Sequence, residues 1–218
     1  MSLAIFDLDN TLLNGDSDHA WGEYLVQKGI VEEAWYRRQN DHFYELYKQG
    51  KLDIMEYLEF ALQPLTRFDM AQLKQMHDEF MDQVIHPMRL PKAEALLNKH
   101  RDQGDYLLII TATNRFITGP IAHALGVDDI IATDAEIINN RYSGKTSGIP
   151  CFQDGKVTRL QRWLESNQHN LAGSYFYSDS INDLPLLKAV THPVAVDADE
   201  RLLAEAKMRG WPCISLRD

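Results

Sequence analysis

Two aspartates, Asp7 and Asp9, lie one residue apart near the start of the chain, directly after the apolar run LAIF. Such a run predicts a buried strand, and in an open α/β sheet ligands bind beyond the carboxyl ends of the strands. Because side chains alternate along a strand, both carboxylates are expected on the same side. They repel each other unless a cation lies between them, and Mg²⁺ prefers oxygen ligands. The pair therefore predicts a magnesium site at a strand end.

Further polar side chains follow other predicted strands or open predicted helices. Thr111 lies near the end of an apolar run, Lys156 opens a helix-like segment, and Asp179 and Asp183 lie in SDSINDLP. A carboxylate can attack phosphorus and form an aspartyl-phosphate, while a second carboxylate protonates the leaving oxygen and later activates water. A hydroxyl, an ammonium group and Mg²⁺ can hold the phosphoryl oxygens where charge develops. This combination indicates phosphoryl transfer.

These side chains require a scaffold in which several strand ends meet. Apolar runs predict further strands over residues 106–113, 128–133, 174–180 and 193–197. Amphipathic segments lie before, between or after them, so the pattern predicts an α/β fold with a parallel sheet covered by helices on both faces. The segment AEIINNRYSG departs from this pattern, because Asn139 and Asn140 between two β-prone pieces indicate a hairpin.

The stretch from about residue 16 to residue 86 differs in composition from the rest of the chain, because it is polar and rich in aromatic residues. Its apolar residues recur every three or four positions in four segments, and Gly29, Gly50 and Pro64 interrupt them. We expect four packed helices inserted in the α/β unit. The aromatic stripe in the second segment is interpreted as helix packing rather than as a cofactor site. Its members are Trp35, Tyr36, Phe43, Tyr44 and Tyr47.

Composition restricts the partners. The chain has 218 residues, 44% of them hydrophobic, and a formal net charge of −10, which argues against nucleic acid or an anionic membrane as the main partner. The two cysteines, Cys151 and Cys213, form no disulfide or metal pattern, and no basic, apolar leader opens the chain. We expect a cytoplasmic protein that neither spans nor binds a membrane. The sequence does not indicate an oligomeric state.

The order of the motifs resembles the haloacid dehalogenase superfamily, and within it the phosphoserine-phosphatase-like branch (subfamily IB). DLDNT, ITAT, DGKVTRL and SDSINDLP resemble its four motifs in order. The resemblance implies a three-layer Rossmann-like core with a mostly parallel sheet, and a helical cap of the C1 type inserted after the first strand. It places the core at residues 1–14 and 87–218 and the cap at residues 15–86.

The resemblance also implies a role for each motif residue in a Mg²⁺-dependent phosphatase acting on a small phosphorylated metabolite. Asp7 would be the nucleophile and Asp9 the general acid and base, while Thr111 and the Ala112 backbone would bind phosphate. Lys156 would be the lysine of the third motif, and Asn182 would orient the phosphate. Mg²⁺ would contact the Asp7 side chain, the Asp9 carbonyl and Asp179, with Asp183 as a further or supporting ligand.

Substrate choice would lie in the cap. Phosphoserine phosphatases carry a glutamate nine residues after the nucleophile that meets the substrate amine, and here that position is Asp16. An ungapped register places Ala61 where they carry an arginine for the substrate carboxylate. A buried carboxylate without such a donor is costly, so an amine-bearing phosphate without a carboxylate, such as L-histidinol phosphate, fits better. Its imidazole could stack on Trp21 or Tyr24.

Several alternatives stay open at this point. Asp16 is equally typical of a helix N-cap, and Arg37, Arg38 or Arg67 could replace the missing arginine if the cap register is wrong. Phosphoserine or a broad range of small phosphates remains an alternative substrate. A phosphoryl-accepting signalling domain or a non-catalytic binding protein is the alternative of a different class.

Other nucleotide and metal motifs are not supported. Gly144-Lys145-Thr146 lacks the earlier glycine of a phosphate-binding loop, because Asn139 stands there. No GxGxxG follows a strand, and the histidines form no zinc pattern.

Overall fold

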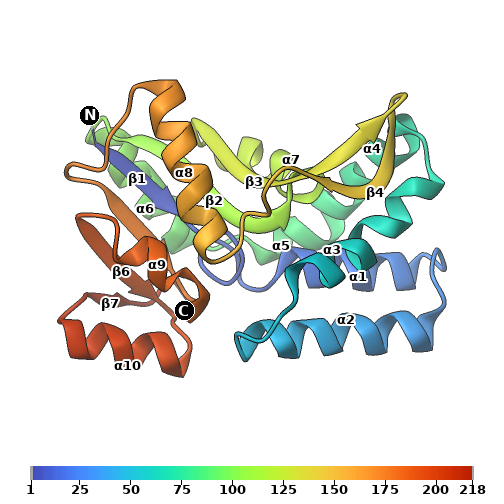
Figure 1. Ribbon diagram of the computed structural model, residues 1–218, viewed down its shortest axis with the longest axis horizontal. Coiled ribbons are helices and arrows are strands. Elements are labelled where there is room, and N and C mark those ends of the chain that lie inside the picture. The colour runs from blue at the N-terminus through green and yellow to red at the C-terminus, as the bar shows by residue number, and fades with distance from the viewer. Residues whose placement is uncertain (1, 218) are drawn as a thin grey trace.

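The computed structural model describes residues 2–217 (Figure 1), and within this range seven strands form one sheet in the order β4-β3-β2-β1-β5-β6-β7. The strands are β1 (Leu3–Phe6), β2 (Tyr106–Asn114), β3 (Asp129–Ile138), β4 (Arg141–Ser147), β5 (Tyr175–Ser178), β6 (His192–Val196) and β7 (Cys213–Ile214). All neighbouring strands are parallel except β3 and β4. The predicted α/β fold with a mostly parallel sheet is confirmed. The short edge strand β7 was not predicted, because two residues carry no periodicity.

The antiparallel exception is the predicted hairpin. β3 and β4 are joined by Asn139 and Asn140, whose φ angles are 51° and 58°. A two-residue hairpin turn of this kind requires positive φ at both central residues, and asparagine tolerates it better than most side chains. The hairpin also reaches the inserted helices, since β4 packs against η1 (Gln63–Arg67) and α3 (Ile54–Leu62).

The sheet is the middle of three layers because successive residues of each buried strand point to opposite faces. In β1, Ala4 and Phe6 belong to one apolar cluster, whereas Leu3 and Ile5 belong to the other. The helices outside the insertion are α6 (Pro91–Asp102), α7 (Arg115–Leu125), α8 (Asp154–Asn167), α9 (Leu184–Leu187), which follows η3 (Ile181–Asp183), and α10 (Glu200–Arg209). The first two cover one face and α8 to α10 the other, as Figure 1 shows for α6, α7 and α8.

The chain between β1 and β2 is helical, as predicted. It forms α1 (Ser17–Gln27), α2 (Glu33–Lys48), α3, η1 and α4 (Met70–Phe80), and then a π-helical turn η2 (Met81–Ile85) that leads into α5 (His86–Met88). An acidic side chain caps the amino end of each of the four long helices, because its oxygens accept the free backbone N–H groups there. These caps are Asp16, Glu32, Asp53 and Asp69.

The inserted helices pack on the sheet through a shared apolar cluster that contains Trp21 of α1, Phe80 of α4 and Phe6 of β1. The chain leaves the α/β unit and returns to it at one place. There Leu13 pairs with Arg89, and the Asn14 N–H donates to the Met88 carbonyl. This crossing supports an insertion near residues 15–86. The division into a core and a cap domain stays a proposal.

Within the insertion, α1 and α2 approach closely at one glycine. A Cβ on Gly22 would lie 2.5 Å from Nδ2 of Asn40, which donates a 2.9 Å hydrogen bond to the His19 carbonyl. No larger residue fits between the helices there. The contact fixes the amino-terminal half of α1, which carries Asp16 and Asp18, against α2.

Candidate active site

The four motif segments meet at the carboxyl ends of the central strands. Because β1 lies between β2 and β5, Asp7 after β1, Thr111 in β2 and Asp179 after β5 come to the same edge of the sheet. The carboxyl end of a parallel sheet is where α/β proteins bind ligands. The structure thus brings together residues that lie far apart in the sequence.

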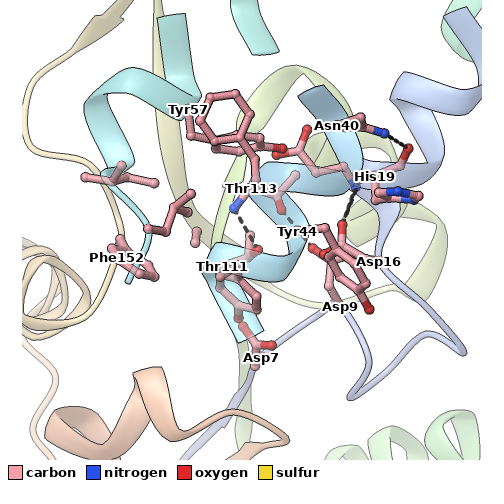
Figure 2. A pocket seen from close by; sticks show the side chains of 16 residues that line it. Asp7, Asp9, Asp16, His19, Asn40, Tyr44, Tyr57, Thr111, Thr113 and Phe152 are labelled. Carbon is pink, nitrogen blue, oxygen red and sulfur yellow. Dashed lines mark hydrogen bonds between the residues drawn. The ribbon is translucent and has the colours of Figure 1, made fainter. Parts of the chain in front are cut away.

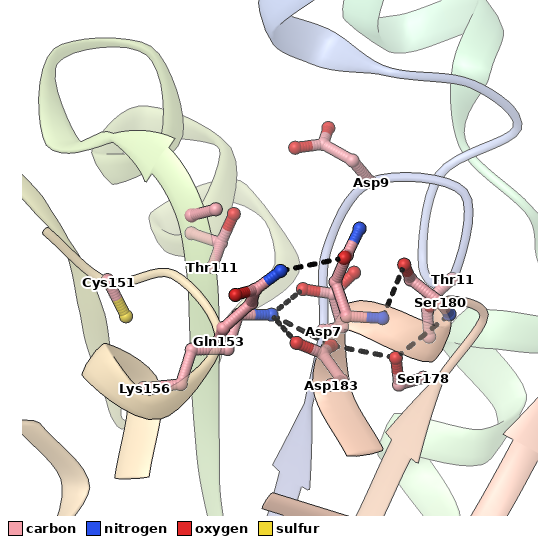
Figure 3. Close-up of polar contacts among 12 residues, drawn as sticks. Asp7, Asp9, Thr11, Thr111, Cys151, Gln153, Lys156, Ser178, Ser180 and Asp183 are labelled. Atoms are coloured by element: carbon pink, nitrogen blue, oxygen red, sulfur yellow. Dashed lines mark hydrogen bonds and ion pairs between the residues drawn. The ribbon is translucent and has the colours of Figure 1, made fainter. Parts of the chain in front are cut away.

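Lys156 is the centre of an ion-pair cluster (Figure 3). Its Nζ lies 2.7 Å from Oδ1 of Asp7 and 2.7 and 2.8 Å from the two carboxylate oxygens of Asp183. The Ser178 hydroxyl donates a further 2.7 Å hydrogen bond to Oδ2 of Asp183. All four side chains are buried. With both oxygens engaged in this way, Asp183 supports the lysine, which favours the supporting role over direct metal ligation.

The start of α8 delivers this lysine. Lys156 is the third residue of the helix, and the preceding Gly155 lies so close to the Pro150 carbonyl that a Cβ would be 2.1 Å from its oxygen. Glycine is therefore required for the helix to begin against this loop. The first turn of α8 then points the buried Lys156 side chain toward Asp7 and Asp183.

Burial and like charge control the ionisation of this cluster. Burial raises the pKa of Asp7 to about 7, although the neighbouring Lys156 lowers it. Burial lowers the pKa of Lys156, but Asp183 and Asp7 outweigh this effect and the net pKa is raised. Lys156 is therefore a permanent cation that holds one oxygen of the proposed nucleophile.

Asp9 has its own hydrogen-bond environment. Its Oδ1 accepts a 2.7 Å bond from the Ser17 N–H at the start of α1, and its Oδ2 accepts a 2.8 Å bond from the Thr113 hydroxyl. Burial raises the pKa of Asp9 to about 7, and Asp16 raises it further, while the bonds from Ser17 and Thr113 lower it. A carboxyl group with a pKa near neutrality can donate and accept a proton, which suits acid–base catalysis.

Thr111 and Ala112 precede Thr113, the residue of β2 that bonds the Asp9 carboxyl group. The Thr111 Oγ1 accepts a 3.2 Å hydrogen bond from the Thr113 N–H, and both Thr111 and Ala112 line the cavity next to Asp7. Alternation along β2 therefore places Thr111 and Thr113 on the same side. Thr111 was predicted from the sequence and Thr113 was not, although the same alternation of side chains along a strand indicates both.

The charges around Asp7 fit a divalent cation. Asp7, Asp179 and Asp183 contribute three carboxylates against the single ammonium of Lys156, and both Asp7 and Asp183 raise the pKa of Asp179 after the larger effect of burial. Among residues 2–217 no three His, Cys, Asp or Glu side chains converge as a metal-binding group. The proposed set needs only two such side chains, Asp7 and Asp179, and Mg²⁺ is often held by one or two carboxylates with water and phosphate oxygens. The donor set fits Mg²⁺.

A cavity of about 50 Å³ extends from Asp7 toward the inserted helices (Figure 2). This is room for a few water molecules, so entry of a phosphorylated metabolite requires the helices to move. Among the predicted residues, the walls include Asp7, Asp9, Asp16, Thr111 and Ala112. The other lining residues are Asp18, His19, Asn40, Phe43, Tyr44, Tyr47, Leu52, Ile54, Tyr57, Thr113 and Phe152. Of the residues that the structure describes, no arginine or lysine is in this lining.

Asp16 caps α1 as one interpretation of the sequence predicted, whereas its contact with the substrate amine stays a prediction. Its Oδ1 accepts 2.9 Å hydrogen bonds from the N–H groups of Asp18 and His19, so it caps α1. It also lines the cavity. Burial raises the pKa of Asp16, and the bond from the His19 N–H lowers it. The helix N-terminus therefore holds this carboxylate in place at the cavity wall.

The cap alignment from the sequence is wrong at Ala61, which is buried in α3 and is absent from the cavity wall. The three alternative arginines do not take over, since Arg37 pairs with Glu23 and Glu33 and Arg67 donates to the Ile30 carbonyl. Arg38 is not in the lining either. An ungapped register assigns positions by residue count alone and takes no account of which helix face borders the cavity.

The predictions about aromatic residues also need correction. Trp21 and Tyr24 do not line the cavity but are buried in the apolar cluster, where both contact Phe80 edge to face. Phe43, Tyr44 and Tyr47 of the second helix line the cavity, and Phe43 also packs against Tyr57 and Phe60 as predicted, so the packing interpretation was incomplete for this part of the stripe. Hydrophobic periodicity identifies a buried helix face but not what covers it.

Asn182 lies at the junction of the sheet end and the inserted helices. Its Nδ2 donates a 3.0 Å hydrogen bond to the Tyr47 carbonyl at the end of α2, and its Oδ1 accepts one of 3.2 Å from Gln153. It is absent from the cavity lining. A phosphate-orienting role therefore stays a prediction, while the observed contact ties the motif loop to α2.

Comparisons with known proteins agree with this geometry. A family model described as haloacid dehalogenase-like hydrolase matches residues 4–188. The curated histidinol-phosphatase of Neisseria meningitidis serogroup C (strain 8013) is 46% identical over 220 residues, which cover 99% of each chain. The chain therefore belongs to the haloacid dehalogenase-like hydrolase family, and it is a phosphatase of that family.

Solved structures support the fold. A protein of unknown function from Bordetella pertussis Tohama I has a TM-score of 0.93 and 43% identity, covering 99% of this chain and 98% of that one. A substrate-bound phosphoserine phosphatase has a TM-score of 0.73 and 17% identity, covering 98% of this chain and 92% of that one, which shows a shared fold. No helix within residues 2–217 has the length and apolar character needed to cross a membrane. The cytoplasmic location stays a prediction.

Proposed function

We propose that this protein hydrolyses a small amine-bearing phosphomonoester, with L-histidinol phosphate as the favoured substrate, in a Mg²⁺-dependent reaction through an aspartyl-phosphate on Asp7. The observation that carries the proposal is that Asp7, Asp9 and Asp16 line one cavity whose lining contains no arginine or lysine. The name of the Neisseria relative, histidinol-phosphatase, supports the same substrate. Phosphoserine or a broad set of small phosphates is the alternative.

The reaction divides into two displacements at phosphorus. A carboxylate oxygen of Asp7 attacks, the bond from phosphorus to the alcohol oxygen breaks, and protonated Asp9 donates its proton to that leaving oxygen. Ionised Asp9 then accepts a proton from water as the water oxygen attacks the aspartyl-phosphate, which releases inorganic phosphate and restores Asp7. Because the pKa of Asp9 is raised to about 7, both of its protonation states are accessible near neutral pH.

The remaining residues of the site bind the phosphoryl group or balance its negative charge. Lys156, 2.7 Å from Asp7, keeps the nucleophile oriented and stabilises the negative phosphoryl group, and the Thr111 hydroxyl would donate to a phosphoryl oxygen. Mg²⁺ would be held by the Asp7 side chain, the Asp9 carbonyl and Asp179, and it supplies positive charge that offsets these carboxylates.

The lining argues for an amine and against a carboxylate in the substrate. Asp16 and Asp18 present negative or hydrogen-bond-accepting oxygens to the cavity, whereas a substrate carboxylate would find no arginine or lysine in the lining. A buried carboxylate without a cationic partner is costly by general principle, because its charge is not balanced. Phosphoserine should therefore bind less well than an amino alcohol phosphate.

A phosphate-release screen tests the proposal. The purified protein is assayed with and without Mg²⁺ on L-histidinol phosphate, phosphoserine, phosphoethanolamine and a sugar phosphate. We expect Mg²⁺-dependent release with the highest kcat/KM on L-histidinol phosphate. A preference for phosphoserine would contradict the substrate assignment, whereas slow, single-turnover accumulation of aspartyl-phosphate would indicate a signalling domain.

The nucleophile is tested in the same screen. Asp7→Asn removes the attacking carboxylate while keeping its shape, so hydrolysis of the best substrate should fall at least about 10³-fold. The matched control is Asp102→Asn, an exposed aspartate on α6. Full activity in Asp7→Asn would remove Asp7 from the mechanism, and no release by the unmodified protein on any phosphate would favour a binding protein.

A further inference from the structure

The proposed reaction leaves one buried acidic residue of the cavity unused. Asp18, in the first turn of α1, is 7% exposed and lines the cavity together with Tyr57 of α3, whose hydroxyl lies near enough to the Asp18 carboxyl group to lower its pKa. Acidic side chains are seldom buried to this extent without a partner that compensates the charge. Asp18 therefore calls for an explanation other than the chemistry at phosphorus.

The cavity has an order from one end to the other. Figure 2 shows Asp7 at one end, Tyr57 at the opposite end, and Asp9 and Asp16 between them. The Tyr57 hydroxyl lowers the pKa of Asp18, so the two side chains lie close together and Asp18 is assigned to the Tyr57 end of the cavity. A substrate held by Asp7 at its phosphate would place its first polar group near Asp16 and a more distant group near Asp18.

The far end is lined by rings and aliphatic side chains. Phe43 and Tyr57 lie edge to face with their ring centroids 5.4 Å apart, and Leu52 and Ile54 are aliphatic residues of the same cavity lining. Such walls favour a flat, partly apolar group, and the single carboxyl group of Asp18 would fix its orientation by accepting a hydrogen bond.

Electrostatics explain why Asp18 favours a donor. Burial raises the pKa of Asp18 to about 8, and Asp16 raises it further, although the Tyr57 hydroxyl lowers it. Without a cationic or N–H partner the group is largely a neutral acid at pH 7. A ligand that donates a hydrogen bond or carries positive charge would restore the ionised form and gain a strong, charge-assisted bond.

We propose that Asp18 and Tyr57 form a second recognition subsite, which binds a planar nitrogen heterocycle of the substrate while Asp16 binds its amine. This inference rests on the proposed function, and it assigns specificity to Asp18 in addition to Asp16. In L-histidinol phosphate the phosphate, the amine and the imidazole follow one another along the carbon chain. Asp7, Asp16 and Asp18 line the same cavity, so each of these three substrate groups can meet a carboxyl group there. An imidazole N–H donates to Asp18, and its ring packs against Phe43 and Tyr57.

The test compares two amine-bearing substrates, L-histidinol phosphate with the ring and phosphoethanolamine without it. The ratio of their kcat/KM values measures recognition of the ring. In Asp18→Asn this ratio should fall about 10- to 100-fold, because one hydrogen bond to a charged group is lost. In Asp16→Asn both values should fall together. The matched control is Asp78→Asn, an exposed aspartate on α4, which should keep the ratio.

Tyr57→Phe gives an independent test if Asp18→Asn fails to fold. It removes only the hydroxyl group that bonds Asp18 and should lower the same ratio about threefold to tenfold. An unchanged ratio in both variants, or equal losses on both substrates, would overturn the subsite.

Product binding separates this inference from the proposed function. L-histidinol, titrated calorimetrically into the protein with inorganic phosphate present, should bind the unmodified chain and bind Asp18→Asn at least about tenfold more weakly. If no phosphate is hydrolysed but this difference in binding is found, the proposed function fails and the subsite stands. If L-histidinol phosphate is hydrolysed but Asp18→Asn binds L-histidinol normally, the subsite fails alone.

Discussion

The Thr113 hydroxyl donates a 2.8 Å hydrogen bond to Oδ2 of Asp9. The N–H of the same residue donates to Oγ1 of Thr111, at 3.2 Å. One residue at the end of β2 therefore orients both the proposed acid–base group and the proposed phosphate-binding hydroxyl. This relationship makes the end of β2 a positioning element for both halves of the reaction.

Asp9→Asn should act selectively on substrates with poor leaving groups. An alkoxide needs a proton as it leaves, so kcat on an alkyl phosphate should fall about 10²–10⁴-fold. The p-nitrophenolate ion leaves without protonation, and the first step on p-nitrophenyl phosphate should be much less affected. Burst kinetics with both substrates measure this difference. Equal losses in the first step would show that Asp9 does not act as the acid.

Thr113→Val should reproduce part of this effect by removing the bond that orients Asp9. We expect kcat on an alkyl phosphate to fall about tenfold, since one hydrogen bond to a charged group is lost. The side chain keeps its shape, so the thermal midpoint should change little. Thr158→Val, on α8, is the control and should keep full activity. A normal kcat in Thr113→Val would mean that Ser17 alone orients Asp9.

Lys156→Met should destabilise the fold as well as abolish turnover. The substitution leaves the buried carboxylates of Asp7 and Asp183 without their cation, and removing one partner of a buried ion pair costs about 3–5 kcal/mol. Urea unfolding at pH 7 measures the free energy of unfolding, and exposed Lys188→Met is the control. A loss of activity at unchanged stability would show that the two carboxylates are compensated without the lysine.

Metal addition should stabilise the protein through Asp179. Adding Mg²⁺ to chelator-treated protein should raise the thermal midpoint, and at 100 times the dissociation constant a ligand contributes about 2.7 kcal/mol. Asp179→Asn should lose most of this response, because one of the two proposed carboxylate ligands is gone. Differential scanning fluorimetry over a Mg²⁺ series, with Ca²⁺ as comparison, gives the result. An identical response in Asp179→Asn would place the ion elsewhere.

His77 should make stability depend on pH. Burial lowers the pKa of His77 below 6.5, although its 2.9 Å contact with the Ile117 carbonyl raises it. Because the unfolded chain takes up the proton more readily, this contribution to stability is fully present above about pH 6.5 and is lost as the pH falls from there through the lower pKa of the folded state. Unfolding free energies measured between pH 5 and 8 should show a slope that weakens in His77→Gln. The exposed control His123→Gln should keep the slope.

Periodicity and motif order were sufficient to predict the α/β class, the hairpin at Asn139 and Asn140, and the helical insertion. These features depend on local patterns: apolar runs, residues that tolerate positive φ, and apolar positions three or four apart. The convergence of Asp7, Thr111 and Asp179 followed from strand ends that meet in a parallel sheet. Lys156 could be assigned by the resemblance, but nothing in its local sequence indicated that it lies between Asp7 and Asp183.

The cap residues could not be predicted in the same way. Ala61 is buried elsewhere, Trp21 and Tyr24 pack inside the apolar cluster, and the cavity is lined instead by Phe43, Tyr57 and Asp18. A periodic apolar pattern predicts that a helix face is buried, but it does not indicate which residues that face contacts. Periodicity is a property of one helix, whereas a cavity wall is formed by several helices and strands.

The sequence by itself determined which chemical groups this protein has and the strand ends that carry them, because alternation and strand order are local consequences of the chain. Only the tertiary structure decided their partners. Lys156 lies between the carboxylates of Asp7 and Asp183, Thr113 lies beside Asp9, and Asp18 lies beside Tyr57. Those contacts join segments far apart in the sequence, so they arise from helix packing and close approach at residues such as Gly22 and Gly155 rather than from any local pattern.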